Sequence, residues 1–308
     1  MEIGMIGLGR MGGNMAQRLL NGGHKVVAYD ANVSAVESVA QQGATGASSL
    51  ENLKTLLSPP RAVWVMVPSG TPTEDTISSL AKIFSPGDII IDGGNSNYKE
   101  SMRRSSWLSG YEIKFLDVGT SGGVWGLEGG YSLMIGGDED SFHSLKPLFQ
   151  CLAPDTDKGF GYVGPAGAGH FVKMVHNGIE YGMMQAYAEG FELMQAKTEF
   201  DLDLGNITEI WRFGSVVRSW LLDLTADALT EDPLLEHLEA YVEDSGEGRW
   251  TVQESLDLAI PLPVITLALQ ARFRSRQDHP FGARLLSAMR NQFGGHGVKE
   301  RSVTPDLE

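Results

Sequence analysis

A glycine-rich loop near the start of the chain limits the possible folds more than any other feature of the sequence. It follows an apolar segment, Glu2–Ile6, that reads as a strand, and leads into a predicted helix, Met11–Asn21. The loop has the pattern G-x-G-x-x-G, made by Gly7, Leu8, Gly9, Arg10, Met11 and Gly12. Such glycines permit a tight turn, let a pyrophosphate approach the backbone and allow close helix–strand packing, while the helix N-terminus favours the anion. The loop therefore predicts a dinucleotide site after the first strand.

An acidic residue at the end of the second predicted strand, Lys25–Tyr29, supports this interpretation. Asp30 lies 23 residues after Gly7, close to the spacing of about 20 residues expected for a ribose-binding acid. A carboxylate there can accept a hydrogen bond from a ribose 2′-OH but repels a 2′-phosphate, and Ala31 beside it supplies no cation. The pattern favours NAD as cofactor, and Arg10 inside the loop leaves NADP as the less favoured alternative.

The two parts of the chain differ in their hydrophobic periodicity. Short apolar runs such as Ala62–Val67 and Asp88–Ile91 alternate with amphipathic stretches, which predicts a parallel sheet with crossover helices. After Gly164 the strand patterns stop. Five helices are predicted there: Phe171–Lys197, Ile207–Leu229, Leu234–Glu243, Val264–Arg276 and Ala283–Gln292. We therefore expect an α/β domain over residues 1–164, which binds the dinucleotide, and an all-helical domain over 165–308 for substrate and oligomer contacts.

Charge and composition exclude several classes of partner. The 308 residues include 24 Lys and Arg against 39 Asp and Glu, a net charge of −15, which argues against binding to nucleic acid. The longest mainly apolar stretch, Leu258–Leu269, contains two prolines and is shorter than the roughly 20 residues of a membrane span, so no membrane contact is expected. The single cysteine, Cys151, cannot form an internal disulfide, which favours the cytoplasm.

The predicted helix Phe171–Lys197 carries an unusual row of polar residues. They are Lys173, His176, Asn177, Glu180 and Tyr181. At 100° per residue Lys173 and Glu180 differ by about 20° in azimuth and stand two turns, about 10 Å, apart. A solvated helix face is the alternative, but such faces usually repeat Glu, Lys and Gln. A row of five different polar types on an otherwise apolar helix points to a site for a small substrate.

Four motifs together resemble the 6-phosphogluconate dehydrogenase family, within the β-hydroxyacid dehydrogenases. They are GLGRMGGNMAQRLL from Gly7, IDGGNS at Ile91–Ser96, GTSGG at Gly119–Gly123 and KMVHNGIEYG at Lys173–Gly182. The last motif is the most specific, because HNGIEY marks the members that decarboxylate sugar phosphates. The resemblance covers nearly the whole chain, in a compact form of the family, and implies a Rossmann-type N-terminal domain.

The resemblance implies an activity: 6-phosphogluconate is oxidised at C3, and the β-keto acid then loses CO2 to give ribulose 5-phosphate. Lys173 matches the family's base, Glu180 the acid that protonates C1, and Asn177 belongs to the same catalytic group. A lysine that is neutral when substrate is bound can take the hydroxyl proton and, once protonated, can stabilise the enolate. No metal is required, and the histidines show no metal-ligand spacing.

The resemblance also assigns binding residues. Substrate contacts are implied for Asn95, Ser121, Gly122, Gly123, His176, Asn177 and Tyr181, and cofactor contacts for Val67, Pro68, Ser69 and Asn95. Arg272 matches a phosphate-binding arginine, and Arg290 with His296 matches a pair that reaches in from a neighbouring subunit, so a homodimer or homotetramer is expected. Ser245 stands where the larger members carry a phosphate-binding lysine, which leaves open how this chain holds the phosphate.

Two other functions remain possible from the sequence. A non-decarboxylating 3-hydroxyacid dehydrogenase would keep Lys173 but has no evident use for Glu180. A catalytically silent protein that senses NAD and NADH would need neither residue. The release of CO2 separates the first alternative from the leading hypothesis, and turnover separates the second.

Overall fold

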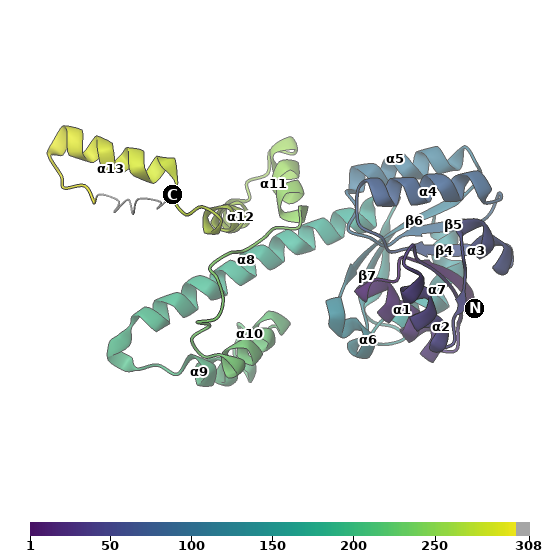
Figure 1. Ribbon diagram of the computed structural model, residues 1–308, viewed down its shortest axis with the longest axis horizontal. Coiled ribbons are helices and arrows are strands. Elements are labelled where there is room, and N and C mark those ends of the chain that lie inside the picture. The colour runs from purple at the N-terminus through teal and green to yellow at the C-terminus, as the bar shows by residue number, and fades with distance from the viewer. Residues whose placement is uncertain (300–308) are drawn as a thin grey trace, which may run out of the picture. The chain divides into compact units, whose positions relative to one another are not determined.

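The computed structural model describes residues 1–299, which form two compact units (Figure 1). The first contains residues 1–180 and 246–261, and the second contains residues 181–245 and 262–299.

The first unit is built on one sheet of eight strands in the order β3-β2-β1-β4-β5-β6-β7-β8. The strands are β1 (Glu2–Ile6), β2 (Lys25–Tyr29), β3 (Thr45–Gly46), β4 (Ala62–Val65), β5 (Ile89–Asp92), β6 (Lys114–Ser121), β7 (Ser132–Gly137) and β8 (Phe160–Gly164). All neighbouring strands are parallel except β6 and β7, which pair antiparallel. The predicted Rossmann-type α/β fold is confirmed, with β7 and β8 running opposite to the other strands of the sheet.

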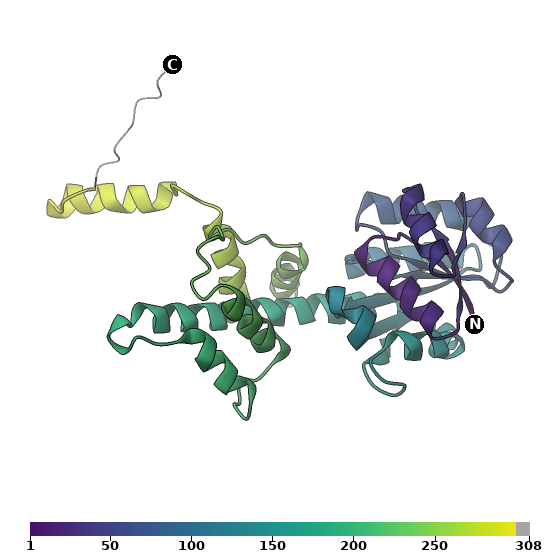
Figure 2. The same ribbon diagram turned by 60° about the horizontal axis from the view of Figure 1, so that its bottom comes forward.

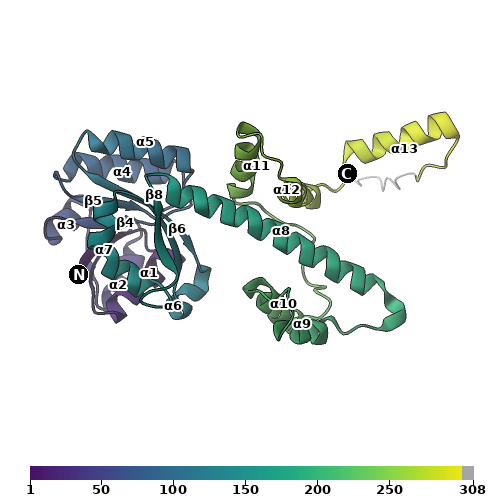
Figure 3. The same cartoon turned by 180° about the vertical axis from the view of Figure 1, so that it is seen from behind.

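Helices cover both faces of this sheet, as Figures 1 and 3 show. One face packs on α1 (Arg10–Asn21), α2 (Val33–Gln41) and α7 (Glu139–Leu152), and the other on α3 (Leu50–Leu56), α4 (Thr71–Ile83) and α5 (Tyr98–Ser109). Side chains alternate between the two cores along the central strands: Trp64 of β4 joins the first, whereas Val63 and Val65 join the second. Burial on both faces explains the continuous apolar runs in the central strands.

Beyond β8 the residues that the structure describes contain helices and no strand, so the predicted all-helical region is confirmed. These helices are α8 (Ala168–Ala196), α9 (Leu204–Arg212), α10 (Trp220–Glu231), α11 (Glu247–Asp257), α12 (Pro263–Ser275) and α13 (Phe281–Gly294). Short turns of helix complete the chain: η1 (Gly123–Trp125), α6 (Gly126–Gly129) and η2 (Thr198–Phe200). Within residues 1–299 no helix combines the length and apolar character that spanning a membrane would require.

Two helix predictions in the second unit were wrong. The segment predicted as one helix, Ile207–Leu229, is two: Gly214 takes a positive φ of 85° between them, and the Ser219 side chain caps α10 (green in Figure 2). The segment Leu234–Glu243 forms turns instead of a helix, with Leu235 at a φ of 52°. Leu234 and Leu235 instead line an apolar pocket of about 510 Å³ against α8 and α10, so tertiary packing overrides the helical pattern.

Candidate active site

The glycine loop lies at the carboxyl end of β1, where the strand order reverses between β2 and β4. Gly7 has a φ of +89°, and a Cβ there would stand 2.3 Å from the Met66 carbonyl oxygen. A Cβ on Gly12 would stand 1.9 Å from the Gly7 carbonyl oxygen, so this position admits only glycine if α1 is to pack on β1. At Gly9, by contrast, an added Cβ meets nothing within 4 Å. The loop thus has two glycines required by packing and one that faces open space.

Open space at Gly9 leaves room for an anion at the start of α1. Gly9 caps that helix without a side-chain hydrogen bond, so the first N–H groups of α1 lack the usual cap. Arg10 is exposed at the first helical position and Met11 follows it. The residues after β4, Val67 to Ser69, and Asn95 after β5 follow neighbouring strands at the same edge of the sheet. Ligands of open α/β sheets bind at such a reversal point.

Asp30 is held beside the loop by backbone groups. Its Oδ2 accepts a hydrogen bond from the Leu8 N–H at 2.6 Å, and its Oδ1 accepts one from the Asn32 N–H at 2.7 Å. The carboxylate is therefore fixed at the end of β2 next to the glycine turn, as a ribose-binding acid must be. Loop, helix end and acid together fit a dinucleotide without a 2′-phosphate.

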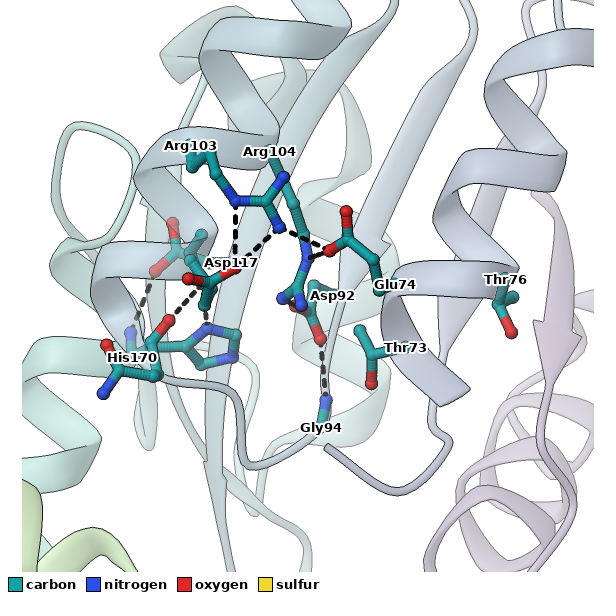
Figure 4. A network of polar contacts seen from close by, with 12 residues as sticks. Thr73, Glu74, Thr76, Asp92, Gly94, Arg103, Arg104, Asp117 and His170 are labelled. Carbon is teal, nitrogen blue, oxygen red and sulfur yellow. Dashed lines mark hydrogen bonds and ion pairs between the residues drawn. The ribbon is translucent and has the colours of Figure 1, made fainter. Parts of the chain in front are cut away.

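A buried network fixes the start of α8 on the sheet (Figure 4). Asp117 of β6 accepts hydrogen bonds from the N–H groups of Gly167, at 2.7 Å, and His170, at 2.9 Å. The His170 ring lies 2.7 Å from the Ser101 hydroxyl of α5. Burial raises the pKa of Asp117 above its ordinary value. The carboxylate satisfies N–H groups of the first turn, so the register of α8 against β6 is set one turn before Lys173.

A second network in Figure 4 supports the turn that carries Asn95. Asp92 at the end of β5 accepts from the Gly94 N–H at 3.3 Å and pairs at 3.1 Å with Arg104, which is 2% exposed. Arg104 also pairs with Glu74 of α4 at 2.9 Å. A hydrogen bond from Arg103 lowers the pKa of Glu74 below its ordinary value. Sequence reasoning missed both networks, because isolated polar residues in apolar segments carry no periodic signal.

Lys173 is the centre of a cluster of polar side chains on α8. It is only 8% exposed, and its Nζ donates to the Asn177 Oδ1 at 2.6 Å and lies 3.5 Å from the His176 Nδ1. The Ser121 hydroxyl, at the end of β6, lies 3.5 Å from the His176 Nε2. Glu180 approaches His176 to 3.9 Å. The structure thus brings together five of the residues that the sequence singled out.

The environment of Lys173 pushes its proton affinity in two directions. Burial is the larger effect and lowers the pKa of the Lys173 ammonium, while the charges of Glu180 and Glu247 act to raise it. A lysine with a lowered pKa can be neutral at lower pH than a solvated one and can accept a proton. Glu247 was not predicted, because a single acid between two glycines gives no pattern.

Glycines bring β6 and α8 close together at this cluster. A Cβ on Gly119 would lie 2.3 Å from the Lys173 Cβ, so Lys173 packs directly on the strand. After Ser121 the chain turns through Gly122 and Gly123, with φ angles of 132° and 52° that favour glycine. The Asn14 side chain of α1 donates to the Val124 carbonyl at 3.3 Å, which ties this turn to the dinucleotide helix.

The second unit gathers a separate group around Tyr181. The Arg272 guanidinium lies 3.6 Å from the centre of the Tyr181 ring and donates to the Glu243 carbonyl at 2.8 Å. The Tyr181 hydroxyl accepts from the Ser245 N–H at 3.2 Å. Arg290 is exposed on α13, and the exposed His296 follows the end of that helix. Among residues 1–299 no three His, Cys, Asp or Glu side chains are grouped to hold a metal.

Comparison with known protein families gives two matches that follow one another along the chain. Residues 2–164 match the model of the NAD binding domain of 6-phosphogluconate dehydrogenase. Residues 169–281 match the model of the 6-phosphogluconate dehydrogenase C-terminal domain.

Relatives of two lengths are similar to the chain. An NAD(+)-dependent, decarboxylating 6-phosphogluconate dehydrogenase of Haloferax volcanii is 43% identical, over 98% of this chain and 99% of its own length. A decarboxylating 6-phosphogluconate dehydrogenase of Haemophilus influenzae is 39% identical over 88% of this chain, but the match spans 59% of the relative. The solved 6-phosphogluconate dehydrogenase of Plasmodium falciparum has a TM-score of 0.83 at 29% identity, covering all of this chain and 67% of that one.

Proposed function

The chain belongs to the 6-phosphogluconate dehydrogenase family, and we propose that it oxidatively decarboxylates 6-phospho-D-gluconate to ribulose 5-phosphate and CO2 with reduction of NAD. The similarity to an NAD(+)-dependent, decarboxylating relative of the same length supports the overall reaction. The observation that carries the chemistry is the buried Lys173, paired with Asn177 and two helical turns from Glu180.

The cofactor site comprises the glycine loop, Asp30, Val67 to Ser69 and Asn95. The backbone of Gly9 and the start of α1 would hold the pyrophosphate, and Asp30 would accept the ribose hydroxyls. NAD supplies a hydride acceptor when it is bound. NADP is disfavoured, because its 2′-phosphate would meet the Asp30 carboxylate and finds no cation at Ala31.

Lys173 takes the proton of the C3 hydroxyl as hydride leaves that carbon. Burial favours its neutral form, which the base step needs, and Asn177 holds the Nζ in place at 2.6 Å. The resulting ammonium donates a hydrogen bond to the new C3 carbonyl. The electrons of the C1–C2 bond flow toward that carbonyl as CO2 departs, so the ammonium stabilises the enolate.

Glu180 protonates C1 of the enediol, which completes ribulose 5-phosphate. It lies about two turns along α8 from Lys173, so the two groups can serve different carbons of one extended substrate. His176, Ser121, Gly122 and Gly123 would bind substrate hydroxyls and carboxylate around them.

The substrate phosphate would be bound by Tyr181 and Arg272, and by Arg290 and His296 of a neighbouring copy. An arginine fork suits phosphate, but Arg272 already lies on the Tyr181 ring and the Ser245 N–H already donates to the Tyr181 hydroxyl. We therefore propose a homodimer or homotetramer. Mixing Arg290→Ala with Lys173→Ala subunits should restore activity, and no recovery after subunit exchange would contradict a shared site.

We also propose the division into a cofactor domain over 1–164 and a helical domain over 165–308, which two separate family models support. A cytoplasmic location is likewise a proposal, based on the soluble substrate. Fractionating cells and assaying the soluble and membrane fractions for the protein tests that location.

The test of the function is a substrate and cofactor panel. Purified protein should reduce NAD with 6-phosphogluconate, and more slowly NADP, while releasing one CO2 for each NADH. Reduction of NAD without CO2, or with 3-hydroxyisobutyrate in place of 6-phosphogluconate, would instead support a simple 3-hydroxyacid dehydrogenase. Cofactor binding without turnover on any hydroxyacid would indicate a sensor.

A further inference from the structure

The loop between β6 and β7, residues 122–131, begins with two of the proposed substrate contacts, Gly122 and Gly123. The apolar side chains that follow them lie in solvent: Val124 is 45% exposed and Trp125 is 56% exposed. Burial of apolar surface therefore does little to hold this half of the loop. Other contacts must fix the two glycines in place.

Helix α1, whose first turn belongs to the proposed cofactor site, lies beside the loop (Figures 1 and 3). The Asn14 side-chain amide donates to the Val124 carbonyl at 3.3 Å. The Arg18 Nη1 donates to the carbonyls of Leu127, at 3.0 Å, and Glu128, at 3.3 Å. Because residues four apart share one face of a helix, the same face of α1 holds both halves of the loop.

Arg18 also binds the end of α7. Its Nε donates to the carbonyls of Cys151, at 2.9 Å, and Leu152, at 3.1 Å, and its Nη2 donates to the Ala153 carbonyl at 2.7 Å. The last carbonyls of a helix lack partners within the helix, so this guanidinium satisfies acceptors that α7 cannot. One side chain thus joins α1, the end of α7 and the β6–β7 loop.

This role needs the shape of arginine as well as its charge. A guanidinium carries five N–H groups in a rigid planar fork, whereas a lysine ammonium carries three donors at one point. A lysine at position 18 would keep the charge but could not reach the carbonyls of both segments.

The far half of the loop has a second anchor. A Cβ on Gly126 would stand 1.9 Å from the ring of Tyr131, which is fully buried, so α6 packs directly on the core. Loss of the Arg18 fork should therefore displace the loop without unfolding it. Arg18 lies eight residues after Arg10, about 12 Å along α1. The cofactor site at the start of α1 should thus be less affected than the loop.

We propose that Arg18, together with Asn14, is a positioning residue for the substrate: it acts through the β6–β7 loop and holds Gly122 and Gly123 where they bind 6-phosphogluconate. The proposal rests on the proposed function. Lys173 packs on β6 independently of this loop, through the close contact at Gly119. Substrate binding therefore depends on Arg18, whereas cofactor binding and the chemical step do not.

The first test is the steady-state kinetics of Arg18→Lys and Asn14→Ala beside wild type. Arg18→Lys should raise KM for 6-phosphogluconate about tenfold, the effect of one lost hydrogen bond to a charged substrate. KM for NAD and kcat should stay within about twofold of wild type, as expected when only substrate binding is weakened. Asn14→Ala removes a single contact at the exposed part of the loop and should raise the same KM about threefold.

Arg61→Lys is the matched control. The Arg61 Nε donates to the Lys54 carbonyl at 3.0 Å and its Nη1 pairs with Asp88 at 3.2 Å, but it precedes β4, at the opposite end of the strands from the loop. This variant should unfold at lower urea concentration and keep both KM values. A wild-type KM for 6-phosphogluconate in folded Arg18→Lys, or in Asn14→Ala if Arg18→Lys does not fold, would overturn the proposal. An equal rise in both KM values would do the same, since it would indicate general distortion.

Hydrogen exchange tests the position of the loop without any substrate. The amide N–H groups of residues 122–130 should exchange faster in Arg18→Lys than in wild type, whereas those of β1 and β2 should exchange at the wild-type rate. Unchanged exchange in residues 122–130 would contradict the role of Arg18. If exchange changes as expected but wild type forms no NADH from 6-phosphogluconate, the role of Arg18 in the loop stands and the proposed function fails.

Discussion

Replacement of Gly119 by alanine tests whether the close contact between β6 and α8 places the proposed base. The added Cβ would stand 2.3 Å from the Lys173 Cβ and 2.8 Å from the Gly169 carbonyl oxygen. Neither contact can be relieved at the end of a flexible side chain, because one atom is backbone and the other is the first side-chain carbon. The helix itself must move away from the strand.

The size of the effect follows from these distances. Two carbons attract at about 3.5 Å, so the new contact is more than 1 Å too short. Overpacking of this kind costs about 1–3 kcal/mol in free energy of unfolding. A displacement of about 1 Å at a catalytic group lowers the rate roughly 100-fold. We expect Gly119→Ala to lose more in kcat than its moderate loss of stability would explain, since the folded variant keeps Lys173 misplaced.

The assay compares kcat for NADH formation and urea unfolding in Gly119→Ala and in Gly161→Ala. Gly161 lies in β8, where an added Cβ meets nothing within 4 Å, so it controls for the general effect of removing a strand glycine. Gly161→Ala should resemble wild type in both measurements. A kcat for Gly119→Ala within about threefold of wild type would refute the reasoning, because Lys173 would then tolerate a displaced helix.

Two further predictions concern the cofactor and pH-dependent stability. Asp30→Ala combined with Ala31→Arg should move the ratio of kcat/KM values toward NADP, and unchanged NAD selectivity would contradict the ribose assignment. The hydrogen bond from Arg103 lowers the pKa of Glu74 in the folded protein. The ionised Glu74 therefore stabilises the fold above the unfolded-state pKa of about 4.3, and this stabilisation is lost as pH falls through the folded-state pKa. Glu74→Gln should therefore unfold more easily at pH 7, by ~1 kcal/mol, but match wild type in acid; an equal difference at both pH values would exclude this linkage.

The sequence predicted the elements whose burial pattern is simple. Strands such as Ala62–Val65 and Ile89–Asp92 are buried on both faces, so an unbroken apolar run identifies them. The direction of β7 was not predictable, because antiparallel pairing with β6 leaves the local pattern unchanged. β8 was missed, since its residues are only partly buried and two of its five are glycine.

The helical region shows where pattern and packing disagree. Leu234 and Leu235 have helix-like spacing with Leu238, yet they follow Pro233 and line a pocket against other helices. The sequence marks the break between α9 and α10 with Gly214 and with Ser219, which caps α10. The apolar pattern on both sides concealed this break.

The candidate site was predictable where its residues share one helix or one loop. Lys173, His176 and Asn177 follow helical spacing, and the structure joins them by short contacts. Asp117 and Glu247 could not be identified from the sequence, because Asp117 accepts hydrogen bonds from a distant segment and Glu247 stands on another helix, from which its charge acts on Lys173. Folding alone brings these acids to α8.

The proposed mechanism is tested most directly by measuring NADH formation from 6-phosphogluconate by Lys173→Met beside wild type, with CO2 trapped in the same reaction. Methionine fills the buried space of lysine but cannot carry a proton, so the fold should persist. We predict that wild type releases NADH and CO2 in equal amounts and that the variant binds NAD but forms neither product at a measurable rate. Substantial NADH from the folded variant would contradict the assignment of Lys173 as the base.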